Sequence, residues 1–467
     1  MKTGHIKSKM FRAAPYRIDP SFHLSEGIKV RRMLDNVPYG LTTVGDASDK
    51  VFIGNIFSRV FVKDVAHGVP YLAASDTVLS NLNTGRYLSK KQAAELSYLI
   101  LKKDWILATC SGTLGNVTYT NEEFDGRIAT HDLIRIVPND KNVLRGCLYA
   151  FLASKYGYYQ LTESKFGGVV KHINADHAKN ISVPLFPKEI QQKADSLIKE
   201  AARLREEAAK ELESVECYFL LKNNISLPSD LLAREEKKTS NTRIISFDKI
   251  KSCTIKAMNY SLRSQKILEY LSQLNHIILD DYLETPFRMG VRASFKRIGS
   301  SYNGEDIVSQ SDIHKQNPKD FKKVRVNKEN DNCRARRGTI IMPSAGTLGE
   351  SEVFTKPLLV RSNFEGKLLS EVIGIFNCKS EEDAAYLYVF LSSKIGFRLL
   401  RNMASGTNLM YPIWSLMKNI PVPMCSKEDK KDISSKVLSA FDKRGLADSK
   451  ENEAISLVEA EIEKWNN

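Results

Sequence analysis

Short apolar runs separated by turn residues dominate the first 187 positions. This alternation predicts strands at residues 52–62, 105–109 and 133–137. Apolar residues spaced three and four apart predict helices at residues 90–101 and 148–161. Helices of this kind pack their apolar face against a sheet. The pattern therefore predicts a mixed α+β domain over residues 1–187.

A different pattern begins at Ile190, where apolar residues recur at intervals of four and three with charged residues between them. This 3.5-residue period is typical of a coiled-coil helix, which needs a partner to bury its stripe. A similar stripe runs from Ile433 to Ile462. We expect residues 188–222 and 425–467 to pair as antiparallel helices; the alternative is that each helix packs on its own domain. The expected interface residues are Ile190, Leu197, Leu204, Val215, Ile433, Val437, Ile455, Val458 and Ile462.

The second stripe is imperfect. Arg444 and Glu451 stand where the period predicts apolar residues. Gly445 lowers the helix propensity by about 1 kcal/mol relative to Ala. We therefore expect a helix with a defect at this point.

Two halves of the chain repeat each other. Residues 148–158 (LYAFLASKYGY) recur 239 positions later as residues 387–397 (LYVFLSSKIGF), with seven of eleven positions identical. The same offset relates 180–184 (NISVP) to 419–423 (NIPVP). A repeat of this length is a whole domain rather than one turn of a solenoid. We expect a second α+β domain at residues 244–424, after a polar connector at 223–243.

The composition favours an anionic partner. The 467 residues include 69 Lys and Arg against 55 Asp and Glu, a formal charge of +14. Such a balance suits nucleic acid or a membrane surface, although a merely soluble basic protein is the alternative. No apolar stretch suits a signal peptide or a membrane span. The seven cysteines form no CxxC pair, which fits a reducing cytoplasm without zinc or disulfides.

Each half carries a basic pair, an apolar run and a glycine-bounded turn with the sequence GTLG, at residues 112–115 and 346–349. A hairpin turn explains this better than a phosphate cradle, because no GxxxxGK[ST] motif is present. The polar side chains here could still contact a DNA backbone. These lower-ranked candidates are Lys102, Lys103, Thr113, Arg336, Arg337 and Thr347.

After each repeated helix the two copies diverge, in loops at residues 165–174 and 401–411. Similar scaffolds with different loop tips suit two modules that read different base edges; simple drift in exposed loops is the alternative. The candidate base-reading residues are Lys165, Lys171, His172, Asn174, Arg401, Ser405, Thr407, Asn408 and Tyr411. A dense positive run adds candidate phosphate contacts, or else a solvated face, at Lys322, Lys323, Arg325, Arg334, Arg336 and Arg337.

Signs of catalysis are few. Residues 36–39 (NVPY) are similar to the Asn-Pro-Pro-Tyr of adenine-N6 methyltransferases, but Val37 departs from that pattern and no glycine-rich cofactor motif accompanies it. A turn is the favoured interpretation. No histidines have the spacing of metal ligands. We predict no catalytic residue, no metal site and no cofactor bound by this chain.

The duplicated layout resembles the specificity subunits of type I restriction-modification systems and related methylation-based defence systems. The resemblance rests on residues 103–107, 111–115, 148–158 and 180–184 together with their second-half counterparts. It implies an α+β fold with two similar target-recognition domains joined by two long antiparallel coiled-coil helices. The implied layout is target-recognition domain 1 at 1–187, spacer helix at 188–222, connector at 223–243, target-recognition domain 2 at 244–424 and C-terminal helix at 425–467.

The function implied by the resemblance is non-enzymatic reading of a bipartite double-stranded DNA site, one domain per half-site. The implied partners are DNA adenine methyltransferase subunits, which would dock on the helices and bind S-adenosylmethionine; a restriction or translocase subunit is a further candidate. Two alternatives stay open: an adenine-N6 methyltransferase-like enzyme, and a coiled-coil scaffold that binds protein or RNA.

Overall fold

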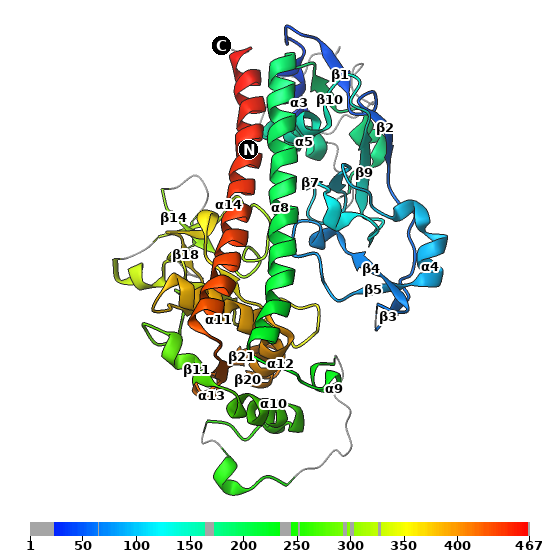
Figure 1. Cartoon of the computed structure of the whole chain (residues 1–467). Helices are drawn as coiled ribbons and strands as arrows, with labels where there is room; N and C mark the ends of the chain where they lie inside the picture. The colour runs from blue at the N-terminus through cyan, green and yellow to red at the C-terminus, as the bar shows by residue number, and fades with distance from the viewer. Residues whose placement is uncertain are drawn as a thin grey trace. The chain divides into compact units, whose positions relative to one another are not determined.

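The chain forms two compact units in a computed structural model (Figure 1). The first unit comprises Met1–Glu206 and Leu446–Asn467, and the second comprises Glu207–Gly445. The described residues are 23–63, 65–163, 172–233, 244–250, 253–292, 297–298, 303–325 and 328–465.

Two four-stranded sheets and a strand pair make up the first unit. The first sheet is antiparallel, in the order β2-β9-β6-β7. In the second sheet, β3-β5-β4-β8, the β4–β8 pair is parallel and the other pairs are antiparallel. The third pairing joins β1 to β10. The strands are β1 (Leu41–Thr43), β2 (Ser48–Phe52), β3 (Phe61–Val62), β4 (Gly68–Leu72), β5 (Tyr87–Ser89), β6 (Ile106–Thr109), β7 (Val117–Tyr119), β8 (Ile128–Ala129), β9 (Leu133–Pro138) and β10 (Ser182–Pro184).

The main core of the first unit draws on distant parts of the chain. Ile106 and Leu148 are fully buried in it together with Ala194, Val458 and Ile462 from the two long helices. The C-terminal residues thus complete the core that the N-terminal strands begin. The shorter helices are α3 (Glu26–Leu34), α4 (Lys90–Glu95), α5 (Arg145–Ala153), α6 (Lys155–Glu163) and α7 (Ala175–Lys179), with 3-10 turns η1 (Ala74–Asp76), η2 (Ser97–Leu99) and η3 (Glu122–Phe124).

Three predicted elements differ in the structure. Residues 52–62 are not one strand, because β2 ends at Phe52 and β3 begins only at Phe61. The helix predicted at 90–101 ends at Glu95, and a 3-10 turn follows. The helix predicted at 148–161 is two helices, since Ser154 has an extended backbone and its Oγ accepts a hydrogen bond from the Gly157 N–H. A serine that caps the next helix in this way ends the previous one.

The second unit repeats the strand order and the strand directions of the first. Its sheets run β12-β19-β16-β17 and β13-β15-β14-β18, again with one parallel pair, β14–β18, and β11 pairs with β22. A further hairpin joins β20 to β21. The strands are β11 (His276–Ile278), β12 (Arg288–Met289), β13 (Arg297–Ile298), β14 (Glu305–Val308), β15 (Lys322–Val324), β16 (Ile340–Pro343), β17 (Leu358–Leu359), β18 (Leu368–Leu369), β19 (Ile373–Phe376), β20 (Ala404–Gly406), β21 (Met410–Pro412) and β22 (Pro421–Pro423).

The core of the second unit centres on the repeated helix. Tyr386 and Phe390 are fully buried there against Phe219, Val437 and Phe441 from the long helices. The helices are α9 (Ser229–Leu232), α10 (Leu262–Gln273), α11 (Glu381–Ser392), α12 (Lys394–Asn402) and α13 (Trp414–Met417), with 3-10 turns η4 (Phe247–Lys249), η5 (Ala257–Tyr260), η6 (Leu279–Tyr282), η7 (Lys328–Cys333) and η8 (Ser362–Phe364). The mixed helix-and-sheet character predicted for both halves is confirmed.

The two long helices predicted from the apolar stripes are present as α8 (Lys188–Lys222) and α14 (Lys427–Lys464). In the first unit Lys193 pairs with Glu453 and Arg205 with Asp448, so the helices run antiparallel there. Within the second unit Lys443 pairs with Glu211, and Lys222 with Asp429, in the same sense. Of the predicted interface residues, Ile190 is half-buried and the other eight are buried.

The defect predicted at Gly445 is wrong, because α14 continues through it. A Cβ atom at this position would lie 2.1 Å from the Oγ of Ser362, the first residue of η8. Glycine therefore permits a close approach between helix and turn. The position equivalent to Gly445, 239 residues earlier, is Glu206, whose carboxylate accepts a hydrogen bond from the N–H of Glu122, the first residue of η3. The equivalent 3-10 turns η3 and η8 therefore both contact a long helix, η3 through a hydrogen bond and η8 through close packing.

Candidate nucleic-acid interface

In the first unit the glycine-bounded turn joins β6 to β7. Gly112 and Gly115 have φ values of +71° and +79°, which glycine adopts without strain. The Thr109 hydroxyl donates to the Thr113 carbonyl and closes the turn at 2.6 Å. The hairpin turn predicted here is confirmed. Thr113 is exposed on it.

This turn lies beside the end of the divergent loop. The Ser111 hydroxyl and the Nδ1 atom of His172 are 3.0 Å apart, and the N–H of Ile173 donates to the carbonyl of Cys110 at 3.1 Å. His172 is half-buried. Asn174 is exposed and its Oδ1 atom caps α7 through the N–H of His177 at 2.7 Å. The predicted residues Lys165 and Lys171 lie outside the described residues.

The second unit pairs the equivalent loops. Gly346 and Met410 exchange two backbone hydrogen bonds, of 3.2 and 2.8 Å. Met410 begins β21, the second strand of a hairpin in which Ser405 stands opposite Tyr411. Thr347 is exposed on the neighbouring turn. The duplicated GTLG turn and the divergent loop therefore lie side by side in each unit, although 60 or so residues separate them in sequence.

Most predicted side chains of the second hairpin point to the surface. Thr407, Asn408 and Tyr411 are exposed, and Ser405 is half-buried. Their hydroxyl and amide groups are suitable donors and acceptors for base edges. Their role in DNA reading stays a prediction.

Arg401 differs from the expectation for a base-reading residue, because its side chain is buried. Its guanidinium donates to the carbonyls of Gly349, Glu352 and Phe354 at 2.7, 2.8 and 2.9 Å. Burial lowers the pKa of Arg401 to about 10. Arg401 thus holds the segment that follows the GTLG turn instead of presenting its charge to solvent.

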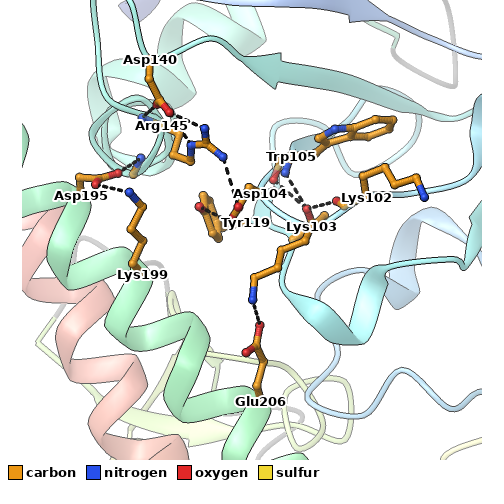
Figure 2. Close-up of polar contacts among 12 residues, drawn as sticks. Lys102, Lys103, Asp104, Trp105, Tyr119, Asp140, Arg145, Asp195, Lys199 and Glu206 are labelled. Carbon is orange, nitrogen blue, oxygen red and sulfur yellow. Dashed lines mark hydrogen bonds and ion pairs between the residues drawn. The ribbon is translucent and has the colours of Figure 1, made fainter.

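The two lysines of the predicted basic pair in the first unit have different surroundings. Figure 2 shows Lys103 directed at Glu206 on α8, with 3.1 Å between Nζ and Oε1, whereas Lys102 points away from that carboxylate. Burial opposes the charge of Lys103, but Glu206 outweighs it and raises the pKa of the ammonium. Lys102 is exposed, with Asp125 at 3.6 Å. Lys103 therefore anchors the turn before β6 to the helix.

A network of paired charges continues from this anchor (Figure 2). Asp104 accepts a hydrogen bond from the Tyr119 hydroxyl at 2.8 Å and lies 3.2 Å from Arg145 at the start of α5. Arg145 also donates through Nε to Asp140 at 2.7 Å. Burial, together with Asp104, raises the pKa of Tyr119. Since each charge has a partner, this network stabilises the contact between sheet and helix.

The unit-two counterpart of Lys103 makes the corresponding contact. Arg337 lies 3.2 Å from Asp442 on α14, and 3.3 Å from Glu381. The residues that follow, Asp104 and Gly338, both have left-handed backbones, with φ of +66° and +77°. Sequence reasoning missed these anchors, and the 239-residue offset gives no signal for them, because it aligns Glu206 with Gly445 and not with Asp442.

The positive run of the second unit is only partly neutralised. Lys323 lies 2.5 Å from Asp306, and Arg334 pairs with Glu305 and with Asp331. The remaining predicted cations are exposed, and no ion pair joins them to a carboxylate among the described residues; they are Lys322, Arg325 and Arg336. Their contact with phosphates stays a prediction.

The segment considered for catalysis forms a turn. Residues 35–39 follow α3 without regular structure, and Tyr39 packs edge-on against Trp465 with 5.8 Å between ring centroids. The described part of the chain holds no group of three or more His, Cys, Asp or Glu placed to bind a metal ion. Among the same residues no helix is both long and apolar enough to cross a membrane.

Comparison with known proteins gives one family match. Residues 54–216 match the family described as "Type I restriction modification DNA specificity domain". No curated protein matches the chain significantly.

Solved structures align over most of the chain at low similarity. One is a type I restriction-modification S subunit from M. genitalium, with TM-score 0.35 and 14% identity over 92% of this chain and 96% of that chain. Another is the HsdS subunit from Thermoanaerobacter tengcongensis, with TM-score 0.27 and 14% identity over 92% and 96%.

Proposed function

We propose that the whole chain is the DNA-reading subunit of a methylation-based restriction-modification complex, because residues 54–216 match the type I restriction-modification DNA specificity domain. It reads a bipartite double-stranded site, with one unit for each half-site. It carries no catalytic residues of its own.

The observation that carries this proposal is the repetition of the matched domain. The family match ends at residue 216, but the second unit has the same two four-stranded sheets in the same strand order. A second copy of a DNA specificity domain needs a second DNA segment to read. Two half-sites about one helical turn apart face the same side of B-DNA, so one protein can engage both major grooves.

The two neighbouring loops of each unit suit different roles in DNA binding. The sequence GTLG is the same in the two units, so it suits what both half-sites share, which is the sugar-phosphate backbone. The neighbouring loops differ, so they suit base edges, which vary between half-sites. We assign base reading to His172, Ser405, Thr407, Asn408 and Tyr411, and backbone contact to Thr113 and Thr347.

The long helices are proposed as the spacer and as the docking site for partners. Antiparallel ion pairs between α8 and α14 within each unit support this role. We propose the layout of target-recognition domains at 1–187 and 244–424, helices at 188–222 and 425–467, and a connector at 223–243. DNA adenine methyltransferase subunits, which bind S-adenosylmethionine, would supply the chemistry, and a restriction or translocase subunit is a further partner.

Methylome sequencing tests the proposal. Cells that express the chain with its neighbouring methyltransferase gene should carry a split, asymmetric methylated motif. Replacing residues 17–185 with those of a homologue of different specificity should change one half of the motif, and replacing residues 244–424 should change the other half. The matched control is the same strain with the methyltransferase alone.

Two results would contradict the proposal. One is an unsplit motif, or none, when both proteins are present. The other is binding of S-adenosylmethionine by the isolated chain, which would favour an enzyme.

A further inference from the structure

The same leucine of the duplicated GTLG turn has different surroundings in the two units. In the first unit Leu114 is half-buried and packs against the main core. In the second unit its counterpart, Leu348, is 40% exposed. The tetrapeptide is the same in both units, so the greater exposure of Leu348 results from the residues that surround it in the second unit.

A second leucine is exposed on the adjoining loop. Leu409 is 52% exposed at the end of the β20–β21 hairpin, next to Met410, whose backbone is bonded to Gly346. Leu348 is two residues from Gly346 and Leu409 is next to Met410, so both leucines lie close in sequence to the two hydrogen bonds that join the loops. Leaving two large apolar side chains in water forgoes their burial free energy.

Uncharged polar side chains stand next to these leucines in the sequence, and Lys256 donates a hydrogen bond to the Gly406 carbonyl in the same hairpin. Thr347, Thr407 and Asn408 are exposed beside them and offer hydroxyl and amide groups. Hydrogen-bonding groups interspersed with apolar ones match the major-groove edges of bases, where the one apolar group is the 5-methyl of thymine.

We propose that Leu348 and Leu409 form an apolar contact with a thymine methyl group in the half-site read by the second unit. The proposal rests on the proposed function, because it assumes that this unit reads DNA. It adds a chemical requirement: the second half-site contains a thymine whose methyl group contributes to affinity. Leu114 makes no such contact because it is half-buried and packs against the main core of the first unit.

The test removes the methyl group from the DNA and the leucine from the protein. The probe is the split site assigned by domain replacement, with each thymine of the second half-site replaced singly by deoxyuridine. Binding of the complex of chain and methyltransferase is measured by fluorescence anisotropy. One replacement should weaken wild-type binding about 3- to 10-fold. Leu409→Ala and Leu348→Ala should weaken binding to the thymine probe by a similar factor and no longer respond to that replacement.

Two control variants distinguish the loss of a DNA contact from the loss of folding. Leu409→Met conserves volume and should keep the response to deoxyuridine. Leu262→Ala removes a leucine of the same unit that is 43% exposed, at the start of α10, and should leave both affinity and response unchanged.

The inference is overturned if the wild-type complex prefers the split site but ignores every deoxyuridine, or if that half-site has no thymine. It is also overturned if the leucine variants respond like the wild type, or if they release the methyltransferase and leave DNA affinity intact. A complex without preference for any split site contradicts the proposed function itself.

Discussion

Arg205 and Glu451 form a buried ion pair between α8 and α14 in the first unit, with 2.7 Å between Nη1 and Oε2. Asp448 lies 2.7 Å from the other terminal nitrogen, and the three side chains are between 9% and 14% exposed. Burial and the nearby Glu451 raise the pKa of Tyr149 on α5. The charge at Glu451 that broke the apolar stripe therefore has a partner on the facing helix.

Removing Arg205 should destabilise the first unit strongly. Arg205→Ala leaves two buried carboxylates without a cation, so the free energy of unfolding should fall by about 3–5 kcal/mol in urea denaturation. The triple variant Arg205→Met, Asp448→Ala, Glu451→Leu should recover most of this loss. Arg203→Ala, at an exposed residue of the same helix, is the control and should change it by less than about 0.5 kcal/mol. A loss below about 1 kcal/mol for Arg205→Ala would contradict the pairing.

Gly445→Ala should destabilise the second unit, although alanine is the better helix former by about 1 kcal/mol. The new Cβ atom would meet the Ser362 Oγ at 2.1 Å, and overpacking of this kind costs about 1–3 kcal/mol. Ser362→Gly removes the obstacle and suits the φ of +45° at that residue. Thermal unfolding should show a lower midpoint for Gly445→Ala and its recovery in the double variant; a higher midpoint for the single variant would refute the close contact.

Arg401→Ala should loosen the segment that follows the second GTLG turn, because three carbonyls lose a charged donor. We expect a loss of about 3 kcal/mol in unfolding free energy and faster amide exchange at residues 349–354. Arg401→Lys should rescue little of it, since an ammonium lacks the planar fork of guanidinium. The control, Tyr411→Ala, should leave stability nearly unchanged. Normal exchange in Arg401→Ala would show that the carbonyls do not depend on Arg401.

Asp306 should make stability depend on acid pH. Burial raises its pKa, but hydrogen bonds from Lys323 and Lys367 outweigh burial and leave the pKa below its ordinary value. A carboxyl with a lowered folded pKa stabilises the fold above its unfolded pKa, about 3.9, and this contribution disappears as pH falls through the folded value. The stability difference between wild type and Asp306→Asn should thus be constant near neutral pH and shrink below about pH 4. Glu365→Gln, at an exposed residue of the same unit, is the control. A stability difference that grows in acid would contradict the lowered pKa of Asp306.

Three exposed cations of the second unit, which make no ion pair among the described residues, should contribute to the salt dependence of DNA binding. Each phosphate contact contributes about 0.9 to the slope of log K against log salt. Replacing Lys322, Arg325 and Arg336 with Ala should lower that slope by up to about 2.7 without changing the motif read. Replacing Arg334, which already has carboxylate partners, should change the slope less. If the triple variant and the Arg334 variant lower the slope equally, Lys322, Arg325 and Arg336 do not make the phosphate contacts.

Local patterns predicted the long helices and the hairpin turn, because periodicity and turn chemistry depend on neighbours in sequence. The break at Ser154 was missed, since the surrounding apolar spacing is continuous and a single capping hydroxyl decides it. The roles of Lys103 and Arg401 were also missed. A cation in a sequence looks the same whether it meets water, phosphate or a distant carboxylate.

By itself, the sequence determined the duplication, the mixed helix-and-sheet class and the two long helices. The duplication follows from comparing two segments 239 residues apart, and the class and the helices follow from periodic patterns of many neighbouring residues. Only the tertiary structure decided which charges are paired, why Gly445 is compatible with a continuous helix and why Leu348 is exposed while Leu114 is half-buried. Those outcomes depend on single contacts between residues far apart in the chain, such as Gly445 with Ser362 and Arg205 with Glu451. Folding brings such residues together through the packing of the whole core, which no local pattern specifies.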